Sequence, residues 1–289
     1  MSFIKRSISY LMRQHVAWLS DFMNFFSEKN GTILIVALFV LTLCAVVLVD
    51  PIPQDTKYHN FSDTRAIFSV PNMLNVFSNI PFIVVGVLGL ILLGRGDGDG
   101  GLNIVSQNRL SYWFLFLGSV LVGAGSGYYH LWPDNATLVW DRMPMTIAFM
   151  ALYSIIISEF VSEKLGRLCL FPFLIIGIGS VLYWWFTESQ GVGDLRFYAV
   201  VQFFPVVTIP VFLVFFKSKF SCVWSYWLLF LTYIGAKIVE LLDSQIHNYI
   251  NFVSGHSIKH VSPAIGLYIL IRAYSNRAAV PGDEPISLV

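Results

Sequence analysis

Charged side chains are scarce in this chain of 289 residues: Asp, Glu, Lys and Arg together make up only 12% of it. Hydrophobic residues account for 56%, and the mean hydropathy of +0.69 lies outside the range of water-soluble domains. This balance excludes an ordinary soluble protein and predicts an integral membrane protein. A net charge of +1 also argues against nucleic-acid binding, which needs a basic surface.

Cysteine is equally sparse, with three residues in the whole chain: Cys44, Cys169 and Cys222. All three lie in apolar segments or at their ends, so the sequence indicates no disulfide framework. Internal repeats and low-complexity tracts are also absent from the sequence, so no repeat architecture is indicated.

What the sequence has instead is a series of long uncharged runs. Residues 32–49 and 168–186 carry no charged residue, and each run is long enough to cross the hydrocarbon of a bilayer as a helix. The same criterion finds further spans near 80–94, 110–130, 143–161, 197–216, 222–242 and 256–274. The predicted fold class is therefore all-α: a polytopic membrane protein with a seven-transmembrane-helix bundle and one extra N-terminal transmembrane helix.

The polar stretches between the spans divide the chain into five parts. We predict a cytoplasmic amphipathic segment over 1–31, the extra transmembrane helix over 32–49, an outer-face connecting segment over 50–77, the seven-helix bundle over 78–275 and a cytoplasmic tail over 276–289. The first of these parts is basic and aromatic, as in helices that lie on the inner surface of a membrane.

Lys and Arg residues are distributed unevenly over the predicted loops. A cytoplasmic N-terminus places most of them on the cytoplasmic side and leaves only Lys57, Arg65, Arg142 and Arg196 outside, which agrees with the positive-inside rule. Both termini are therefore predicted to be cytoplasmic. A bacterial plasma membrane is favoured, with the endoplasmic reticulum or Golgi membrane as the alternative in a eukaryote.

Three polar fragments stand out from the apolar background: G-S-G-Y-Y-H ending at His130, W-D-R-M-P-M containing Asp141, and S-G-H-S-I-K-H ending at His260. Ser126 and His130 are four residues apart, as are His256 and His260, so each pair shares one face of a helix. Three imidazoles around one ion leave a fourth position for water, as in catalytic zinc sites. Asp141 is then the nearby carboxylate that can take a proton from that water.

The predicted topology brings these residues to the same outer mouth of the bundle. His130 ends an outward span, Asp141 precedes an inward span, and His256 opens another inward span.

Each residue alone also has a simpler interpretation. An interfacial His can bind a head group, Ser126 can bond a carbonyl of its own helix, and Asp141 can pair with Arg142 or the helix dipole. Their convergence favours the metal site.

Lys237, Glu240 and Asp243 lie on successive turns at the outer end of the 222–242 span. An intramembrane charge pair is the expected role of this group. The same residues can also form hydrogen bonds to a metal-ligating side chain and so fix its orientation.

The motifs S-x-x-x-H, D-x-x-P-M eleven residues after that His, and a late H-x-x-x-H together resemble the alkaline ceramidase family. This family belongs to a superfamily of seven-helix membrane hydrolases that includes adiponectin and progestin receptor relatives, and the resemblance covers about residues 60–275. It implies zinc on His130, His256 and His260, with Ser126 polarising the substrate carbonyl or oxyanion and Asp141 handling the proton of water. The implied reaction is hydrolysis of the N-acyl amide bond of a ceramide-like lipid to a fatty acid and a sphingoid base.

Two features depart from that family. Animal-type members carry an acidic calcium-binding stretch starting D-W-C-E, of which only Asp63, with Asn72 or Asn75, has a counterpart here. Hard-cation sites usually need several carboxylates, so calcium dependence is doubtful. The extra first span is the second departure, and it is consistent with a separate, bacterial branch whose substrate need not be ceramide itself.

Other classes of function stay open at this point. One is a receptor-like or lipid-remodelling member of the same superfamily, although the predicted orientation is opposite to that of the receptors. Another is a metal or proton transporter that uses intramembrane charges. The expected partners are the membrane and a lipid substrate, ceramide or a related N-acyl lipid, with no nucleic acid; protein partners are left unknown by the sequence.

Overall fold

The computed structural model describes residues 26–95 and 100–280 of the chain. Most of the amphipathic segment predicted over 1–31 lies outside the described residues, as does most of the tail predicted over 276–289.

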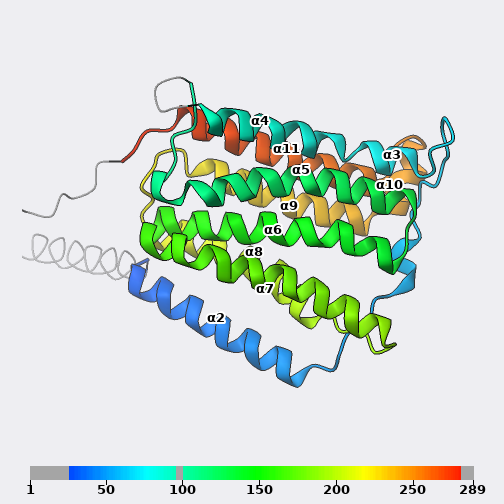
Figure 1. The fold of residues 1–289 in the computed structure, drawn as a ribbon, viewed down its shortest axis with the longest axis horizontal. Helices are drawn as coiled ribbons and strands as arrows, with labels where there is room; N and C mark the ends of the chain where they lie inside the picture. The colour runs from blue at the N-terminus through cyan, green and yellow to red at the C-terminus, as the bar shows by residue number, and fades with distance from the viewer. Residues whose placement is uncertain (1–25, 96–99, 281–289) are drawn as a thin grey trace, which may run out of the picture.

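The described part of the chain is helical and contains no β-strand, only isolated bridges. Its long helices run side by side in one bundle, as Figure 1 shows. The helices are α2 (Glu28–Leu48), α3 (Met73–Phe77), α4 (Ile80–Gly94), α5 (Arg109–Leu131), α6 (Asn135–Phe160), α7 (Glu163–Ser189), α8 (Arg196–Phe215), α9 (Trp224–Leu241), α10 (Asp243–Ile250) and α11 (Gly255–Asn276), with short 3₁₀ turns η1 (Thr56–His59) and η2 (Ser106–Asn108).

Six helical units among the described residues are long and apolar enough to cross a membrane, and a seventh qualifies if α9 and α10, bent by 77°, form one span. The eighth predicted span corresponds to α11, which has 22 residues but is not among these units, since it carries more polar side chains. The all-α, polytopic membrane fold predicted from the sequence is therefore confirmed.

Helix α2 lies at the edge of the molecule, alongside α8 (Figure 1). Only Gly31 of this helix is buried, where a side chain would collide with Phe215, because a Cβ atom there would lie 2.5 Å from Phe215 Cβ. From Ile33 to Leu48 its side chains are apolar except for Thr42, and most of them are exposed, which suits a helix surrounded by lipid.

The two ends of the bundle differ in what they carry. One end, here called the terminal end, holds the start of α2 and the last described residues; the opposite end, the α10 end, holds α3, α10 and the segment 50–72 (Figure 1). Segment 50–72 crosses the α10 end and is held by bonds such as Leu195 N–H to the Ile52 carbonyl, at 2.9 Å. This covered end is where the polar motifs meet.

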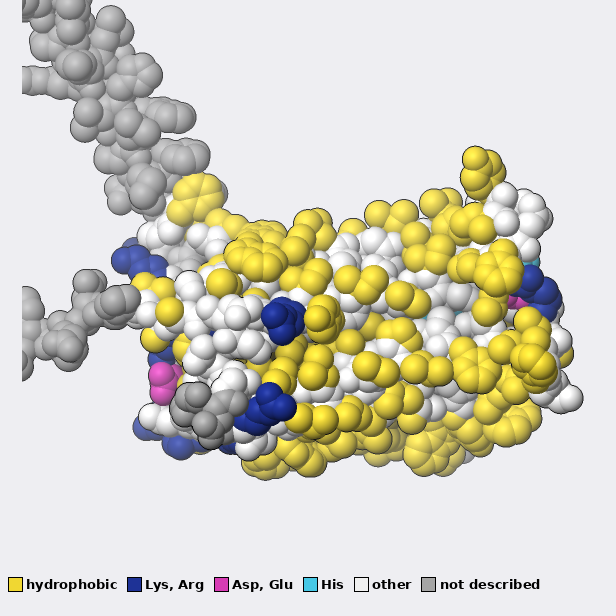
Figure 2. Space-filling view, turned by 90° about the horizontal axis from the view of Figure 1, so that it is seen from above, with side chains coloured by type: hydrophobic (Ala, Val, Ile, Leu, Met, Phe, Trp, Pro, Cys, Tyr) yellow, Lys and Arg dark blue, Asp and Glu magenta, His cyan; other side chains and the backbone are white. Residues whose placement is uncertain are grey.

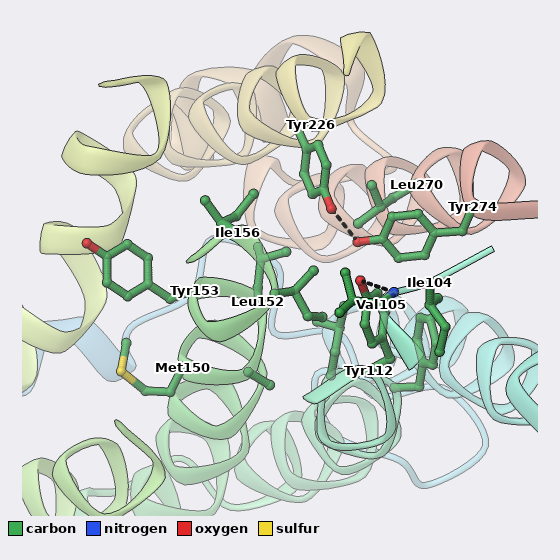
Figure 3. Close-up of a cluster of buried hydrophobic side chains, with 14 of the residues drawn as sticks. Ile104, Val105, Tyr112, Met150, Leu152, Tyr153, Ile156, Tyr226, Leu270 and Tyr274 are labelled. Carbon is green, nitrogen blue, oxygen red and sulfur yellow. Dashed lines mark hydrogen bonds between the residues drawn. The ribbon is translucent and has the colours of Figure 1, made fainter. Parts of the chain in front are cut away.

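A buried ion pair closes the core at the terminal end. Glu159, fully buried on α6, accepts two bonds from the Arg277 guanidinium, at 2.6 and 2.8 Å. The hydroxyls of Tyr112 and Tyr226 also donate to this carboxylate, at 2.6 and 2.8 Å. Tyr226 in turn bonds Tyr274 at 2.8 Å, as Figure 3 shows within the apolar cluster around Leu152 and Leu270. These bonds tie the end of α11 to the end of α6.

We expect Arg277→Met to destabilise the protein by about 3–5 kcal/mol, because it leaves the Glu159 carboxylate buried without a counter-charge. Lys219→Met is the matched control: its pair with Glu163 is exposed, so its loss should cost less than about 1 kcal/mol. Unfolding in detergent micelles by added SDS, followed by circular dichroism, measures both. Equal losses for the two variants would contradict this role for the buried pair.

Candidate active site

Three histidines meet at the α10 end of the bundle. His130 lies in the last turn of α5, and His256 and His260 lie on the first turns of α11. The Nε2 atom of His130 is 3.3 Å from Nε2 of His260 and 3.4 Å from Nε2 of His256. All three side chains are buried, and together they form the one group of ligand atoms in the described chain close enough to hold a metal ion.

Two close contacts between helices, α5 with α6 and α11 with α9, position the helices that carry the site residues. A Cβ atom at Gly125 would lie 2.0 Å from the Trp140 carbonyl oxygen, so only glycine lets α5 come this near to α6. Pro144 has no N–H for that same carbonyl, its i−4 partner, which leaves the oxygen facing α5. Likewise, a Cβ atom at Gly255 would lie 2.0 Å from the Val239 carbonyl oxygen of α9.

The start of α11 is fixed by side-chain caps. Ser254 Oγ accepts from Ser257 N–H at 3.2 Å, and Asp243 Oδ1 accepts from His256 N–H at 2.7 Å. Asp243 Oδ2 also accepts from Ser62 N–H of the covering segment, at 3.0 Å. Acidic and hydroxyl caps suit the positive end of a helix. Asp243 thus positions the backbone of His256, not its ring.

His260 is oriented by residues that the motifs did not indicate. Its Nδ1 atom lies 2.8 Å from Ser78 Oγ and 3.3 Å from Asn79 Nδ2, at the start of α4. Outer partners of this kind set the ring orientation of a metal-ligating histidine. The sequence signal for these two residues is weak: a Ser-Asn pair immediately before an apolar span.

Phe61 covers the histidines from the loop side. Its ring centroid lies 4.6 Å from those of His130 and of His256, and the residue is itself buried. Its neighbour His59 bonds Tyr129 OH and Asn135 Oδ1, each at 2.9 Å, which ties the segment to α5 and α6. No spacing pattern in the sequence pointed to this cover, because it depends on how the loop folds back.

Ser126 and Asp141 are brought together beside the histidines. Ser126 lies one turn before His130 on α5, is buried, and lines the same cavity as Asp141 on α6, close to the Asp141 carboxylate. Helix α6, which carries Asp141, begins at Asn135 because Asp134 caps its N-terminus. Asp134 Oδ1 accepts from Thr137 N–H at 2.6 Å. That same bond holds the pKa of Asp134 below its usual value.

The three charged residues of the 222–242 region do not form one group. Glu240 pairs with Lys237 at 3.0 Å and with Lys259, which lies between the two histidines of α11, at 2.5 Å. Lys259 was not among the predicted site residues, although its place inside the H-x-x-x-H motif is a usable signal. Asp243 stands apart, on the helix cap described above.

The three residues considered for calcium are engaged with protein groups. Asp63 receives two bonds from the Arg65 guanidinium, at 2.8 and 2.7 Å, which holds the pKa of the Asp63 carboxyl below its usual value. Asn75 accepts from Ser257 Oγ at 2.7 Å, and Asn72 donates to the His130 carbonyl at 2.8 Å. These bonds join the loop to α5 and α11.

A cavity of about 290 Å³ extends from this site into the bundle. Its polar part includes Ser126, Asp141 and His260, with the Glu240 ion pairs close by. Its remaining lining is largely apolar and includes Leu115, Val122, Leu152, Ile209, Leu229 and Leu267. A polar centre therefore stands at the head of a space suited to a hydrocarbon chain.

Fold and site together define a membrane-embedded helical protein with a metal-capable histidine centre opening into a lipid-compatible cavity. A family model described as Ceramidase matches residues 59–278, which include every site residue discussed above. The chain belongs to the ceramidase family, so it is a hydrolase that acts on an amide bond of a lipid. Comparison with curated proteins and with solved structures gave no match.

We expect the purified protein to hold about one divalent metal ion per chain, and His130→Ala to lose most of it, because two imidazoles bind an ion far less tightly than three. His247→Ala is the control, since this histidine lies on α10, outside the group. Elemental analysis by mass spectrometry after dialysis checks both. Equal metal content in wild type and His130→Ala would count against the site.

Proposed function

We propose that the protein is a zinc-dependent amidase, embedded in the membrane, that hydrolyses the N-acyl amide of ceramide-like lipids to a fatty acid and a sphingoid base. The observation that carries this proposal is the convergence of three buried imidazole nitrogens on a point beside Ser126 and Asp141, at the head of the cavity.

The spacing of the nitrogens supports zinc. Two nitrogen ligands about 2.0–2.1 Å from a tetrahedral ion are about 3.3–3.4 Å apart. The measured Nε2 separations from His130, 3.3 Å to His260 and 3.4 Å to His256, have this value. Neutral imidazoles are also a donor set that zinc favours. When bound, zinc supplies Lewis acidity and makes water a nucleophile at neutral pH.

Asp141 is suited to transferring a proton from the attacking water to the amine that leaves. Its carboxylate lines the cavity beside the histidines, so it can accept the proton that water loses as it adds to the amide carbonyl. The same carboxyl group can then deliver that proton to the departing amine nitrogen.

Ser126 is suited to binding the carbonyl oxygen. Its hydroxyl is buried at the head of the cavity and can turn from Asp141 to donate to the oxygen on which negative charge develops. The Phe61 ring, packed on two of the histidines, keeps bulk water from this side of the site.

The cavity lining supports a lipid substrate rather than an ion path. Beyond its polar head the wall is formed by leucine, isoleucine and aromatic side chains, which offer an acyl chain a favourable environment and an ion none. This favours hydrolysis over transport of a metal ion or proton.

We also infer that both termini are cytoplasmic and that the site faces the outer or lumenal side, with a bacterial plasma membrane favoured. Two observations support this orientation. The described ends of the chain lie together at the end opposite the histidines (Figure 1). On the face seen in Figure 2, most Lys and Arg side chains gather toward that terminal end, and hydrophobic side chains cover most of the surface between the two ends.

We expect wild-type protein in detergent to release fatty acid and sphingoid base from a mixed lipid extract containing ceramides, and His256→Ala to release none. Mass spectrometry of the extract detects both products. Release from another N-acyl lipid would preserve the chemistry and change the substrate. If wild type held stoichiometric zinc yet altered no lipid, the proposed function would be wrong.

Asp141→Asn should lower kcat about 10²–10⁴-fold, because the amide cannot accept a proton. Ser126→Ala should lower kcat about 10²–10³-fold through loss of the oxyanion donor. Ser119→Ala is the matched control on the same helix: this serine also lines the cavity, but its hydroxyl bonds the Leu115 carbonyl of its own helix. Kinetics on a defined ceramide test all three; a control as impaired as Ser126→Ala would contradict the assignment.

A further inference from the structure

Arg142 is a buried cation without a carboxylate partner. It follows Asp141 on α6 and has only 6% of its surface exposed, yet it appears in none of the ion pairs of the described residues. Its guanidinium carbon lies 4.3 Å from the ring centroid of Trp184 and 4.8 Å from that of Tyr198. These contacts hold the side chain in place without neutralising it.

One side of this guanidinium makes no hydrogen bond within the described part of the chain. Nη2 donates to Gln54 Oε1 of the covering segment at 2.5 Å, whereas Nη1 has no hydrogen-bond partner among the described residues. Arg142 also lines the cavity, at the same polar head as Asp141. An unpaired donor on a buried cation is costly, and a ligand oxygen would satisfy it.

The charges around the cavity favour an anionic ligand. Five charged residues line it: the cations Arg142, Lys237 and Lys259, and the carboxylates Asp141 and Glu240, so three positive and two negative charges leave a net +1. Glu240 is paired with both lysines, so neither lysine charge is left without a counter-charge. Arg142 is therefore the lining cation that is still available to an incoming group.

We propose that Arg142 binds anionic oxygens of the lipid, and that the preferred substrate carries an acidic group at its head-group end, near the scissile amide. The inference rests on the proposed function and deepens it by naming a substrate class. A guanidinium offers paired N–H donors in the geometry that phosphate and carboxylate oxygens need. The carboxylate of the fatty-acid product has the same chemistry, so the experiment must separate the two sources.

The test measures lipid binding by native mass spectrometry in the His256→Ala background, in which turnover is blocked. Two probe pairs differ only in the acidic group: ceramide 1-phosphate against ceramide, and palmitate against 1-hexadecanol. Arg142→Gln removes the charge and Arg142→Lys retains it. Lys57→Gln is the matched control, because Lys57 is an exposed outer-loop cation that does not line the cavity.

We expect ceramide 1-phosphate to bind about tenfold or more tightly than ceramide, as one strong charge-assisted contact allows. Arg142→Gln should abolish this preference, Arg142→Lys should retain part of it, and Lys57→Gln should leave it intact. An Arg142-dependent preference in the palmitate pair alone would support the anion site but move it to the product carboxylate. Equal affinities within both pairs, or a preference that survives in Arg142→Gln, would overturn the proposal.

Binding in this background does not require hydrolysis, which keeps the two proposals separable. If wild type hydrolysed no lipid but the acidic probes bound through Arg142, only the proposed function would fail. If wild type hydrolysed ceramide but showed no Arg142-dependent preference, only the anion site would fail.

Discussion

The close contact between helices at two glycines is the constraint on which the site depends. At Gly125 the backbone of α5 touches the Trp140 carbonyl of α6, and at Gly255 the start of α11 touches the Val239 carbonyl of α9. Without a Cβ atom in the way, these helices approach near enough for side chains of modest length to meet. The first contact sets Ser126 of α5 close to Asp141 of α6, and the second seats the start of α11, which carries His256 and His260, against α9.

Lipid surroundings make this arrangement demanding, because a polar group that faces hydrocarbon has no water to bond. At both ends of the bundle, buried polar side chains form hydrogen bonds and ion pairs with one another. At the terminal end, Glu159 is satisfied by Arg277 and two tyrosines. At the α10 end, Glu240 is satisfied by two lysines. Among the described residues, the exceptions beside the site are Nη1 of Arg142, Nδ1 of His130 and Oδ1 of Asn79, and His247 Nδ1 on α10 is a further one.

The segment 50–72 shows how a connection becomes part of a site. It supplies Phe61 against the histidines, His59 between α5 and α6, and Gln54 on the Arg142 guanidinium. Asp63 is meanwhile held by Arg65 within the same segment, which gives that carboxylate an internal counter-charge. The polar head of the cavity is thus enclosed by loop residues, while its depth is lined by the transmembrane helices.

The sequence by itself determined the membrane class, the helical spans and the three ligand candidates. Span length is set by bilayer thickness, and the four-residue spacing of His256 and His260 is set by the helical turn, so both are local properties. Only the tertiary structure decided that Ser78 and Asn79 orient His260, that Lys259 completes the Glu240 pairs, and that Asp243 caps α11. Those contacts join residues far apart in the chain, and helix packing, which no local pattern encodes, sets the distances between them.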